Sequence, residues 1–360
     1  MLNYFEDLAN RYDVPIQNVI SIALNRYGII CQSVDDNRLR FNLKILGEER
    51  PTFFAVCVNT YLDSPFELKD GNLYLDGVAI GEVSNIEKDT CTSTYFRNNK
   101  KVITLNSNSR SKCIGCKFCG SYSLGEDDAI DFSTEDMVQE YFKNLLIDNN
   151  IPSMENIENI TVCTGCFSNE DALVEHLLTL RRGTGNLGFN GSINYIGSQL
   201  RDYDKVKLLK DTIGDFGIYL TVEKFLEREK FMKREKASLT LDKARDLLEY
   251  SSSIGVTSTF LYILGLEDLE TVKKYMNYFK GSINKFPIVQ VFQDYIPEQE
   301  RYRCDEAKDV EYYLKARRMI DEIFIDTELS PKLWECFRSL YHAKDSDVRV
   351  RKLKKCQEKN

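Results

Sequence analysis

Residues 240–264 have the sequence TLDKARDLLEYSSSIGVTSTFLYIL, which predicts one helix followed directly by one strand. Thr240 is a residue type that caps helix N-termini, and the apolar residues after it recur at the spacing of one helix face. Gly255 is typical of a helix end, and the apolar, β-branched run over 256–264 favours a buried strand. This stretch therefore predicts a helix-to-strand unit.

The same alternation continues on both sides of this unit. Short apolar runs predict strands at 102–105, 160–163, 193–196, 218–222, 256–264 and 288–292. One intervening helix is expected to begin near Ser133, with Asp136 in the capping-box position. Alternating strands and helices indicate a parallel sheet with helices outside it. Because six units are fewer than the eight of a closed barrel, we predict an α/β fold with a partial (βα)6 barrel.

The first part of the chain has a different pattern. Apolar residues recur at helical spacing over 4–12, Pro15 marks the start of a second helix, and the alternation over 39–45 favours a half-buried strand. Asp70-Gly71 and Asp76-Gly77 are hairpin turn signals. We therefore predict an N-terminal α+β accessory domain at 1–98, the barrel at 99–300 and a helical C-terminal extension at 301–360.

Composition limits the class of protein. The chain has 360 residues, of which 42% are hydrophobic, as in ordinary globular proteins. Its longest apolar runs, such as 53–58, are far shorter than the roughly 20 residues of a membrane span. The start MLNYFEDLAN lacks the basic and apolar regions of a signal peptide, so we expect a cytoplasmic protein without a membrane partner. The net charge of -8 argues against nucleic acid as a partner.

Three of the eleven cysteines lie close together after the first predicted barrel strand. Cys113, Cys116 and Cys119 fall within seven residues. Cysteines of a cytoplasmic protein are rarely disulfide-bonded, so a cluster indicates metal or redox ligands. In parallel α/β folds, chemistry lies in loops at the carboxyl ends of strands. Three thiolates can hold a four-iron cluster and leave one iron open to a small molecule.

This segment resembles the radical S-adenosylmethionine (radical SAM) superfamily, over about residues 100–297. The usual motif of that family is Cys-x3-Cys-x2-Cys with an aromatic residue before the third cysteine. Phe118 occupies the aromatic position and Cys116-x2-Cys119 matches, whereas Cys113-x2-Cys116 is one residue shorter than the usual first spacing. The resemblance implies the metal ligands Cys113, Cys116 and Cys119.

The resemblance also implies a binding site for S-adenosylmethionine (SAM). Thr164 and Gly165 match the turn whose backbone binds the amino group of SAM. Glu223 and Arg228 match a pair, similar to that of biotin synthase, that holds the ribose and the methionyl carboxylate. Leu264 ends a strand that lies near the adenine in the family.

The implied activity is reductive cleavage of SAM to a 5′-deoxyadenosyl radical, which abstracts hydrogen from a small-molecule or peptide substrate. The implied cofactors are a [4Fe-4S] cluster and SAM, and the implied electron donor is a flavodoxin- or ferredoxin-type protein. Cys166 is a candidate catalytic hydrogen-atom donor. Its alternative is local packing in the SAM-binding turn.

Two other functions fit the cysteines. Cys113, Cys116, Cys163 and Cys166 form two Cys-x2-Cys pairs, as in a structural zinc site of a non-catalytic binding protein, although this leaves Cys119 unexplained. Cys163 and Cys166 alone could form a dithiol redox pair. With two histidines in the chain, and His176 expected to pack among leucines, histidine-based catalysis is not predicted.

Overall fold

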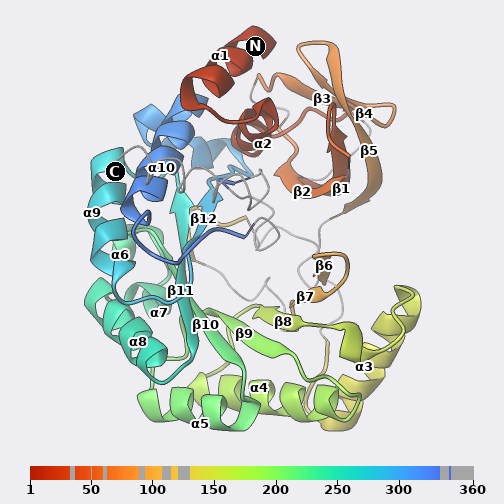
Figure 1. Cartoon of the computed structure of the whole chain (residues 1–360), viewed down its shortest axis with the longest axis vertical. Helices are drawn as coiled ribbons and strands as arrows, with labels where there is room; N and C mark the ends of the chain where they lie inside the picture. Colours follow the sequence, from red (N-terminus) through yellow and green to blue (C-terminus); the bar gives the residue numbers. More distant parts are fainter. Residues whose placement is uncertain are drawn as a thin grey trace.

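The computed structural model describes residues 1–32, 37–49, 51–59, 63–88, 94–107, 115–120, 130–332, 340 and 341. Its larger sheet has seven strands in the order β12-β11-β10-β9-β8-β7-β6, and the strands from β7 to β12 are parallel (Figure 1). Their order in the sheet is their order in the chain, which confirms the predicted alternation. The strands are β6 (Tyr95–Arg97), β7 (Val102–Leu105), β8 (Asn159–Cys163), β9 (Ser192–Gly197), β10 (Phe216–Glu223), β11 (Thr257–Leu264) and β12 (Ile288–Val291).

The sheet curls and leaves one side open, as a partial barrel does (Figure 1). Strand β6 pairs antiparallel with β7 and so adds an edge strand to this sheet, although residues 95–97 fall in the segment predicted as the accessory domain. The edge arises because the turn at 98–101 reverses the chain directly into β7.

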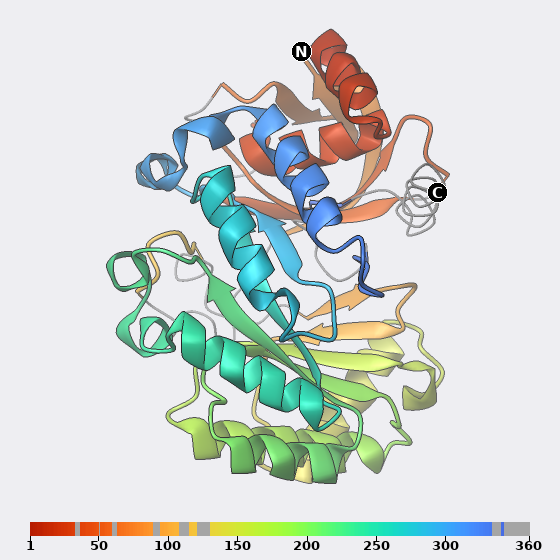
Figure 2. The same cartoon turned by 60° about the vertical axis from the view of Figure 1, so that its left-hand side comes forward.

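Helices cover the outer face of the curled sheet (Figure 2). The apolar faces of the longer helices pack on the outward side chains of the strands, which forms the main core. The short helices α6 and α7 contribute Phe231 and Ala237 to a separate apolar cluster. Neither α5 nor these two short helices were predicted. The helices are α3 (Glu135–Asp148), α4 (Glu170–Gly185), α5 (Tyr203–Ile213), α6 (Arg228–Phe231), α7 (Arg234–Ala237), α8 (Leu241–Ser253) and α9 (Leu269–Lys280).

The start of α3 differs by one residue from the prediction. Thr134, and not Ser133, is the N-cap, and its side chain accepts a hydrogen bond from the backbone N–H of Met137. Met137 therefore occupies the third helical position, and Asp136 is not a capping-box residue. The Ser133 hydroxyl instead contacts the sulfur of Met137.

The N-terminal part contains two helices and an antiparallel sheet, as predicted. Its sheet has the strand order β2-β1-β5-β4-β3. Both predicted hairpin turns are present, with positive φ at Asp70 and Gly71 and at Asp76 and Gly77, as the tight hairpin turn requires. The elements are α1 (Leu2–Tyr12), α2 (Ile16–Tyr27), β1 (Arg38–Ile45), β2 (Thr52–Cys57), β3 (Phe66–Lys69), β4 (Asn72–Leu75) and β5 (Val78–Lys88).

After β12 the chain forms two 3-10 turns, η4 (Pro297–Tyr302) and η5 (Asp305–Lys308), and then α10 (Val310–Ile323). In Figure 2, α10 (blue) lies between the N-terminal helices (red) and α9 (cyan), and it contacts both. The segment predicted as a helical extension contains α10, and residues 333–339 and 342–360 lie outside the described residues. A further short turn, η3 (Met154–Asn156), precedes β8. None of the helices described here has the length and apolar character needed to span a membrane.

Candidate functional site

The cysteine loop follows β7, at the carboxyl edge of the parallel sheet. Its described part, 115–120, contains Cys116 and Cys119, and the backbone N–H of Cys119 donates to the carbonyl of Cys116 at 3.1 Å. The neighbouring Lys117 anchors the loop on both sides. Its N–H donates to the carbonyl of Phe231 at 2.8 Å, and its carbonyl accepts from Gln299 Nε2 at 3.0 Å. The loop is therefore held by segments that follow β10 and β12.

Two glycines let this loop approach its neighbours closely. A Cβ on Gly120 would lie 2.3 Å from a ring carbon of Tyr295, which leaves no space for any side chain. Gly115 has φ +118°, and a Cβ there would lie 2.9 Å from the Cβ of Lys233. Gly120 is needed because a side chain would overlap its neighbour. Gly115 is needed for the same reason and also because its backbone conformation favours glycine.

Cys116 and Phe118 are buried in a small apolar cluster at this edge of the sheet. Their exposed fractions are 6% and 3%. Burial raises the pKa of the Cys116 thiol to about 11, although nearby Lys236 and a backbone hydrogen bond from Lys233 oppose the shift. A metal would displace the proton of such a thiol, because the thiolate is the metal ligand. The other buried members of the cluster are Met232, Ala237, Ile263, Leu266 and Phe292.

Of the three predicted metal ligands, Cys116 and Cys119 lie on one turn and Cys113 lies outside the described residues. Within the described ranges, no three side chains of the histidine, cysteine, aspartate or glutamate type converge on one point. The fit of the loop to a cluster therefore rests on two thiols, a turn that brings them together and an apolar surround. Thiolates in such a setting are the usual ligands of iron–sulfur clusters.

The loop after β8 lies beside the cysteine loop. Lys233 connects the two, because its backbone and Cβ pack against Gly115 while its ammonium donates a hydrogen bond to the sulfur of Cys166. Thr164 is half-buried and Gly165 is buried in the same loop. The structure therefore brings Cys166 close to the cysteine loop.

The loop after β8 is also fixed at its far end. Gln199 forms two 2.9 Å hydrogen bonds with the backbone of Phe167, one to the N–H and one to the carbonyl. Phe167 packs against the imidazole of His176, which also hydrogen-bonds with the Ser107 hydroxyl at 2.7 Å. Burial lowers the pKa of His176 to about 4. His176 therefore packs as a neutral side chain, which agrees with the prediction.

Glu223 ends β10 in a left-handed conformation, with φ 60°. The ladder with β11 shifts register between Thr221 and Glu223, so the strand bulges there. Glu223 Oε2 forms an ion pair with Lys236 Nζ at 2.6 Å, and both side chains are largely buried. The carboxylate predicted to bind the ribose thus lies on the same side of the barrel as Cys116, and its negative charge raises the pKa of that thiol.

Arg228 is buried and holds the backbone of its own segment. Its Nη1 donates to the carbonyls of Val222 and Lys224, and its Nη2 donates to those of Lys236 and Leu239. These four bonds use the donors that a bidentate carboxylate contact would need. Nε of Arg228 has no hydrogen-bond partner among the described residues. Its predicted contact with the methionyl carboxylate stays a prediction.

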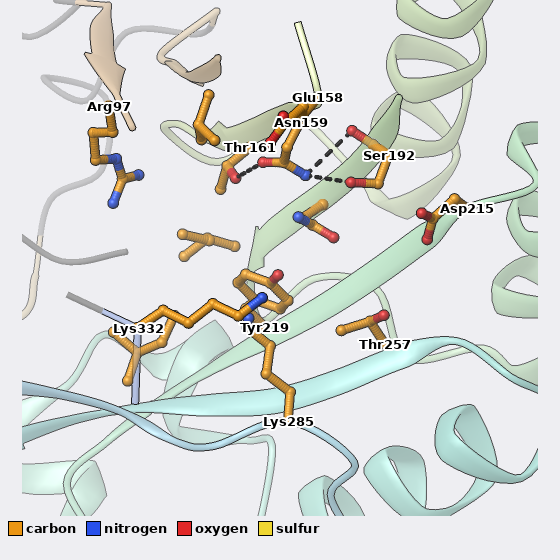
Figure 3. Close-up of a pocket in the computed structure, with 14 residues that line it drawn as sticks. Arg97, Glu158, Asn159, Thr161, Ser192, Asp215, Tyr219, Thr257, Lys285 and Lys332 are labelled. Carbon is orange, nitrogen blue, oxygen red and sulfur yellow. Dashed lines mark hydrogen bonds between the residues drawn. The ribbon is translucent and has the colours of Figure 1, made fainter. Parts of the chain in front are cut away.

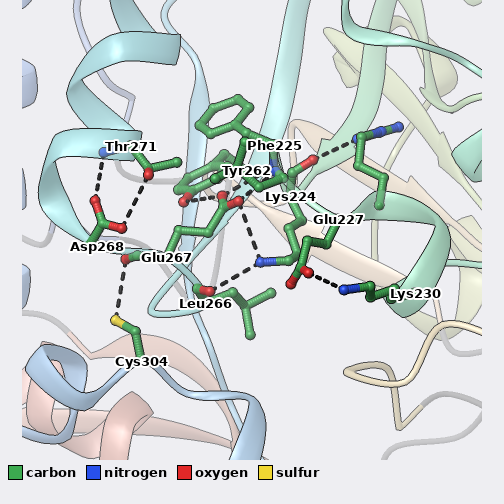
Figure 4. Close-up of polar contacts among 12 residues, drawn as sticks. Lys224, Phe225, Glu227, Lys230, Tyr262, Leu266, Glu267, Asp268, Thr271 and Cys304 are labelled. Carbon is green, nitrogen blue, oxygen red and sulfur yellow. Dashed lines mark hydrogen bonds and ion pairs between the residues drawn. The ribbon is translucent and has the colours of Figure 1, made fainter.

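The loops after β10 and β11 are joined by a buried network of hydrogen bonds around Glu267 (Figure 4). The Glu267 carboxylate accepts from the backbone N–H groups of Phe225 and Leu226 at 3.0 and 2.6 Å and from the Tyr262 hydroxyl at 2.9 Å. Lys224 Nζ lies 3.4 Å from Glu267 Oε1. These bonds offset the cost of burying the charge and fix two site-forming loops together.

Leu264 is fully buried, and its side chain belongs to the main core. Ile263, one position earlier in the strand, belongs instead to the apolar cluster with Cys116 and Phe118, as does Leu266 after the strand ends. Side chains alternate across a strand, so Ile263 points to the opposite face from Leu264. The predicted contact between Leu264 and adenine is not tested by the structure.

Sequence reasoning did not identify Lys233, Lys236 or Glu267. A weak signal for the lysines exists, because they belong to a basic stretch, KFMKREK at 230–236, directly after the predicted Glu223 and Arg228. Glu267 has no such signal, since nothing local shows that an acidic residue after a strand will be buried.

The chain matches no protein-family model, and no curated protein sequence matches it. Its structure is similar to that of Streptococcus suis SuiB bound to S-adenosylmethionine, with 11% identity and a TM-score of 0.41, over 66% of this chain and 51% of SuiB. It is also similar to the radical S-adenosylmethionine methyltransferase TsrM from Kitasatospora setae, solved with cobalamin and a [4Fe-4S] cluster, with 12% identity and a TM-score of 0.35, over 53% and 36% of the two chains.

A third similar structure is OxsB, a cobalamin-dependent S-adenosylmethionine radical enzyme, with 13% identity and a TM-score of 0.31, over 71% of this chain and 36% of OxsB. The chain thus spans about half of SuiB and about a third of TsrM and OxsB.

Proposed function

We propose that this protein is a radical SAM enzyme whose cluster is held by Cys113, Cys116 and Cys119. The observation that carries the proposal is the position of the two described cysteines. They lie on one turn after the first parallel strand of an open six-unit barrel, packed against the loops after β10 and β11. Loops at this edge carry the chemistry of parallel barrels.

The residues around Cys116 fit such a cofactor. Phe118 and the apolar cluster exclude water from one side of the loop. Lys233 brings a cation to the sulfur of Cys166, and Lys236, which is paired with Glu223, lowers the pKa of Cys116 and so favours its thiolate. A four-iron cluster with bound SAM supplies a 5′-deoxyadenosyl radical after one-electron reduction.

Four further groups are proposed to hold SAM. The backbone of Thr164 and Gly165 would bind its amino group, and Glu223 its ribose. Arg228 would act through the fold of the segment that it holds, with Nε left for a ligand. Leu264 would lie near the adenine through its backbone, because its side chain belongs to the core.

Cys166 is proposed as the hydrogen-atom donor to a substrate radical. Its contact with Lys233 also supports a second role, the joining of two loops. A Cys166→Ala variant separates these roles. A donor is required for product formation but not for SAM cleavage, whereas a loop contact affects both. We propose a small molecule or peptide as substrate, and a flavodoxin- or ferredoxin-type electron donor in the cytoplasm.

The proposal is tested by iron content and SAM cleavage in oxygen-free preparations. We expect about four irons per wild-type chain and release of 5′-deoxyadenosine from SAM after dithionite reduction. Cys116→Ala and Cys119→Ala should lose the iron. Cys304→Ala is the matched control, because Cys304 is a half-buried thiol that bonds the carbonyl of Glu267 and should leave iron unchanged.

Cys166→Ala should also keep its iron. Stoichiometric zinc in a colourless wild-type protein, lost when Cys166 is replaced, would instead support the four-cysteine zinc site. Iron retained in both Cys116→Ala and Cys119→Ala would contradict the assignment of the ligands.

A further inference from the structure

A cavity of about 250 Å³ lies inside the curled sheet, at the end opposite the cysteine loop (Figure 3). The first residues of the parallel strands line it, so it lies at their amino ends. None of its lining residues belongs to the cysteine loop, and the cavity is separate from the proposed cluster site. The strand residues are Val102 of β7, Asn159 of β8, Ser192 of β9, Thr257 of β11 and Ile288 of β12, with Asp215 directly before β10.

One wall of the cavity contains uncharged polar side chains that bond one another. The Asn159 amide donates to the Oγ and to the carbonyl of Ser192, at 2.7 and 3.2 Å. It also accepts from the Thr161 hydroxyl at 2.6 Å. Buried amides and hydroxyls are costly unless they form hydrogen bonds, and these three bonds offset that cost.

Asn194 on β9 is buried in the same wall, but its side-chain amide bonds to no residue that the structure describes. It is 6% exposed. Its neighbours Ile193 and Tyr195 belong to the main core on the outer face of the sheet, so Asn194 points inward, where it lines the cavity. The amide therefore presents N–H donors and a carbonyl acceptor, side by side, to the space inside the sheet.

The neighbouring strand makes room for this amide. Gly217 of β10 is paired with Asn194 in the ladder, and a Cβ at Gly217 would lie 2.1 Å from Asn194 Oδ1. A glycine inside a strand weakens the strand and is typical of places that another molecule approaches closely. Here the glycine keeps open the position of an amide that bonds to no described residue.

Beside Asn194 the lining is apolar. Ile196, Tyr219 and Ile288 line the cavity, and they pack together in one small cluster with Leu261. Small-molecule sites typically combine such an apolar surface with a few placed polar groups. The cavity is thus suited to a flat ring that lies on the apolar surface and turns a polar edge to Asn194.

The charged side chains of the cavity do not favour a charged ligand, because both signs are present and two of them are bonded elsewhere. Arg97 donates to the Thr104 hydroxyl. Glu158 forms an ion pair with Lys101 at 2.6 Å. The other charged lining residues, which again have both signs, are Asp215, Lys285 and Lys332 (Figure 3).

We infer that this cavity binds a small uncharged ring with an N–H and a C=O on the same edge, as in a lactam or a nucleobase. Two parallel hydrogen bonds join that edge to the amide of Asn194, because donor and acceptor lie side by side on both partners. A peptide backbone does not fit, since a trans peptide bond points its N–H and C=O in opposite directions. The volume is near the lower end of the usual range for ligand pockets, about 300–1,000 Å³, so the ligand is small.

Calorimetric titration of the full chain with 2-pyridone tests this inference, with N-methyl-2-pyridone as the matched ligand. We expect saturable binding of 2-pyridone. The N-methyl compound should bind more weakly by about tenfold or more, because its methyl group replaces the ring N–H and removes one hydrogen bond. Uracil is titrated as well, and the tighter of uracil and 2-pyridone distinguishes a nucleobase from a simple lactam. These titrations do not depend on iron, so their failure is distinguishable from failure of the proposed function.

Asn194→Ala should also weaken the binding of 2-pyridone by about tenfold or more. Its Tm should equal or exceed that of the wild type, because the lost amide bonds to no described residue. Asn194→Leu, of similar size to the wild type, is the second variant if Asn194→Ala does not fold. Asn277→Ala on the exposed face of α9 is the matched control and should bind as the wild type does.

Absence of saturable binding of both 2-pyridone and uracil by the wild type would overturn the inference. Equal binding of the two pyridones would also overturn it, since the polar edge would then not be recognised. Wild-type affinity in a folded Asn194 variant would show that the ring binds elsewhere, with the same consequence. The comparison of the two pyridones needs no variant and so remains decisive whether or not the variants fold.

Discussion

At the scale of single residues, burial determines which charge states the folded chain allows. His176 shows this most clearly. Its imidazole packs with the rings of Phe132 and Phe167 and pairs with the Ser107 hydroxyl. An imidazolium in this position would lose hydration without gaining an acidic partner, so the neutral form is favoured and the pKa falls from 6.5 to about 4.

The lowered pKa predicts a loss of stability in acid. The unfolded chain takes up a proton on this histidine near pH 6.5, whereas the folded chain does so near pH 4. The contribution of His176 to the free energy of unfolding is therefore fully present above the pKa of the unfolded chain, and it is lost as the pH drops toward the pKa of the folded chain. Because the ring keeps part of its surface exposed, we expect a loss of about 1–2 kcal/mol between about pH 7.5 and about pH 5.

Urea unfolding of the wild type and of His176→Gln at both pH values measures this contribution. The variant keeps a side chain that can bond Ser107 but does not titrate. We expect the pH-dependent loss to be smaller in the variant by the stated amount. Equal pH dependence of the two proteins would contradict the lowered pKa of His176.

At the scale of elements, the ends of helices and the loops between them are fixed by single contacts. The hydroxyl of Thr134 caps α3, while the adjacent Ser133 bonds Asp131, before the helix, and the sulfur of Met137. These two residues are of the same chemical kind and lie side by side. Their different positions relative to the first helical turn give them different energetic roles.

Thr134→Ala is expected to lower the free energy of unfolding by about 1 kcal/mol, because a backbone N–H at the start of α3 loses its acceptor. Ser133→Ala serves as the control and should change stability far less. Urea denaturation of both variants measures the difference. A larger loss in Ser133→Ala would show that the helix begins one residue earlier.

The cysteine loop depends on close packing at Gly120. Gly120→Ala should destabilise the protein by about 1–3 kcal/mol, because the new Cβ would overlap the ring of Tyr295. It should also reduce iron retention, since the ring or the loop must move. Gly281→Ala is the control, as no atom lies within 4 Å of its added Cβ. Iron content and urea unfolding of the two variants provide the test, and equal behaviour would contradict the close contact.

At the scale of the whole molecule, the N-terminal helices are attached to the rest of the chain by polar contacts of unequal burial. Arg26 of α2 forms a 2.8 Å ion pair with Glu300 after β12, and its side chain is 6% exposed. Arg11 of α1 forms a 2.8 Å ion pair with Glu311 of α10, but its side chain is 50% exposed. Ion pairs in solvent contribute little, whereas a buried hydrogen bond between charged groups contributes more. Glu300 also pairs with Arg303 at 2.8 Å and keeps that partner when Arg26 is removed.

Arg26→Ala is therefore expected to cost about 2 kcal/mol of unfolding free energy. Arg11→Ala breaks the exposed contact between the same two parts and should have a much smaller effect. Thermal or urea unfolding measures both. Similar losses in the two variants would mean that burial does not determine the strength of these contacts.

Local patterns were sufficient to predict most of the fold. The helix over Leu241–Ser253, the strand that follows it and the paired positive-φ turns at Asp70 and Asp76 depend on residues close together in the chain. The unpredicted helix α5 has fewer such signals. The order of strands in the barrel was also predictable, because short helical connections place consecutive parallel strands side by side.

The candidate site was predictable only in part. Cys116, Phe118 and Glu223 could be recognised from spacing, and the structure brings them to one edge of the sheet. The contacts of Arg228 could not be predicted, since its four carbonyl partners depend on the exact path of the segment up to Leu239. The same holds for Lys233 and Glu267, whose partners belong to other loops.

Hydrophobic period, turn residues and cysteine spacing act over a few positions, so residue order alone was enough to predict most of the helices, the strands and the position of a cysteine-rich loop. The burial of charged groups depends on segments that meet only after the sheet has curled. The same holds for which groups lie together at one end of the strands. The polar cavity around Asn194 is an example, because its lining comes from seven strands and the segments beside them. Burial and long-range pairing are properties of the folded chain, and local sequence carries no direct record of them.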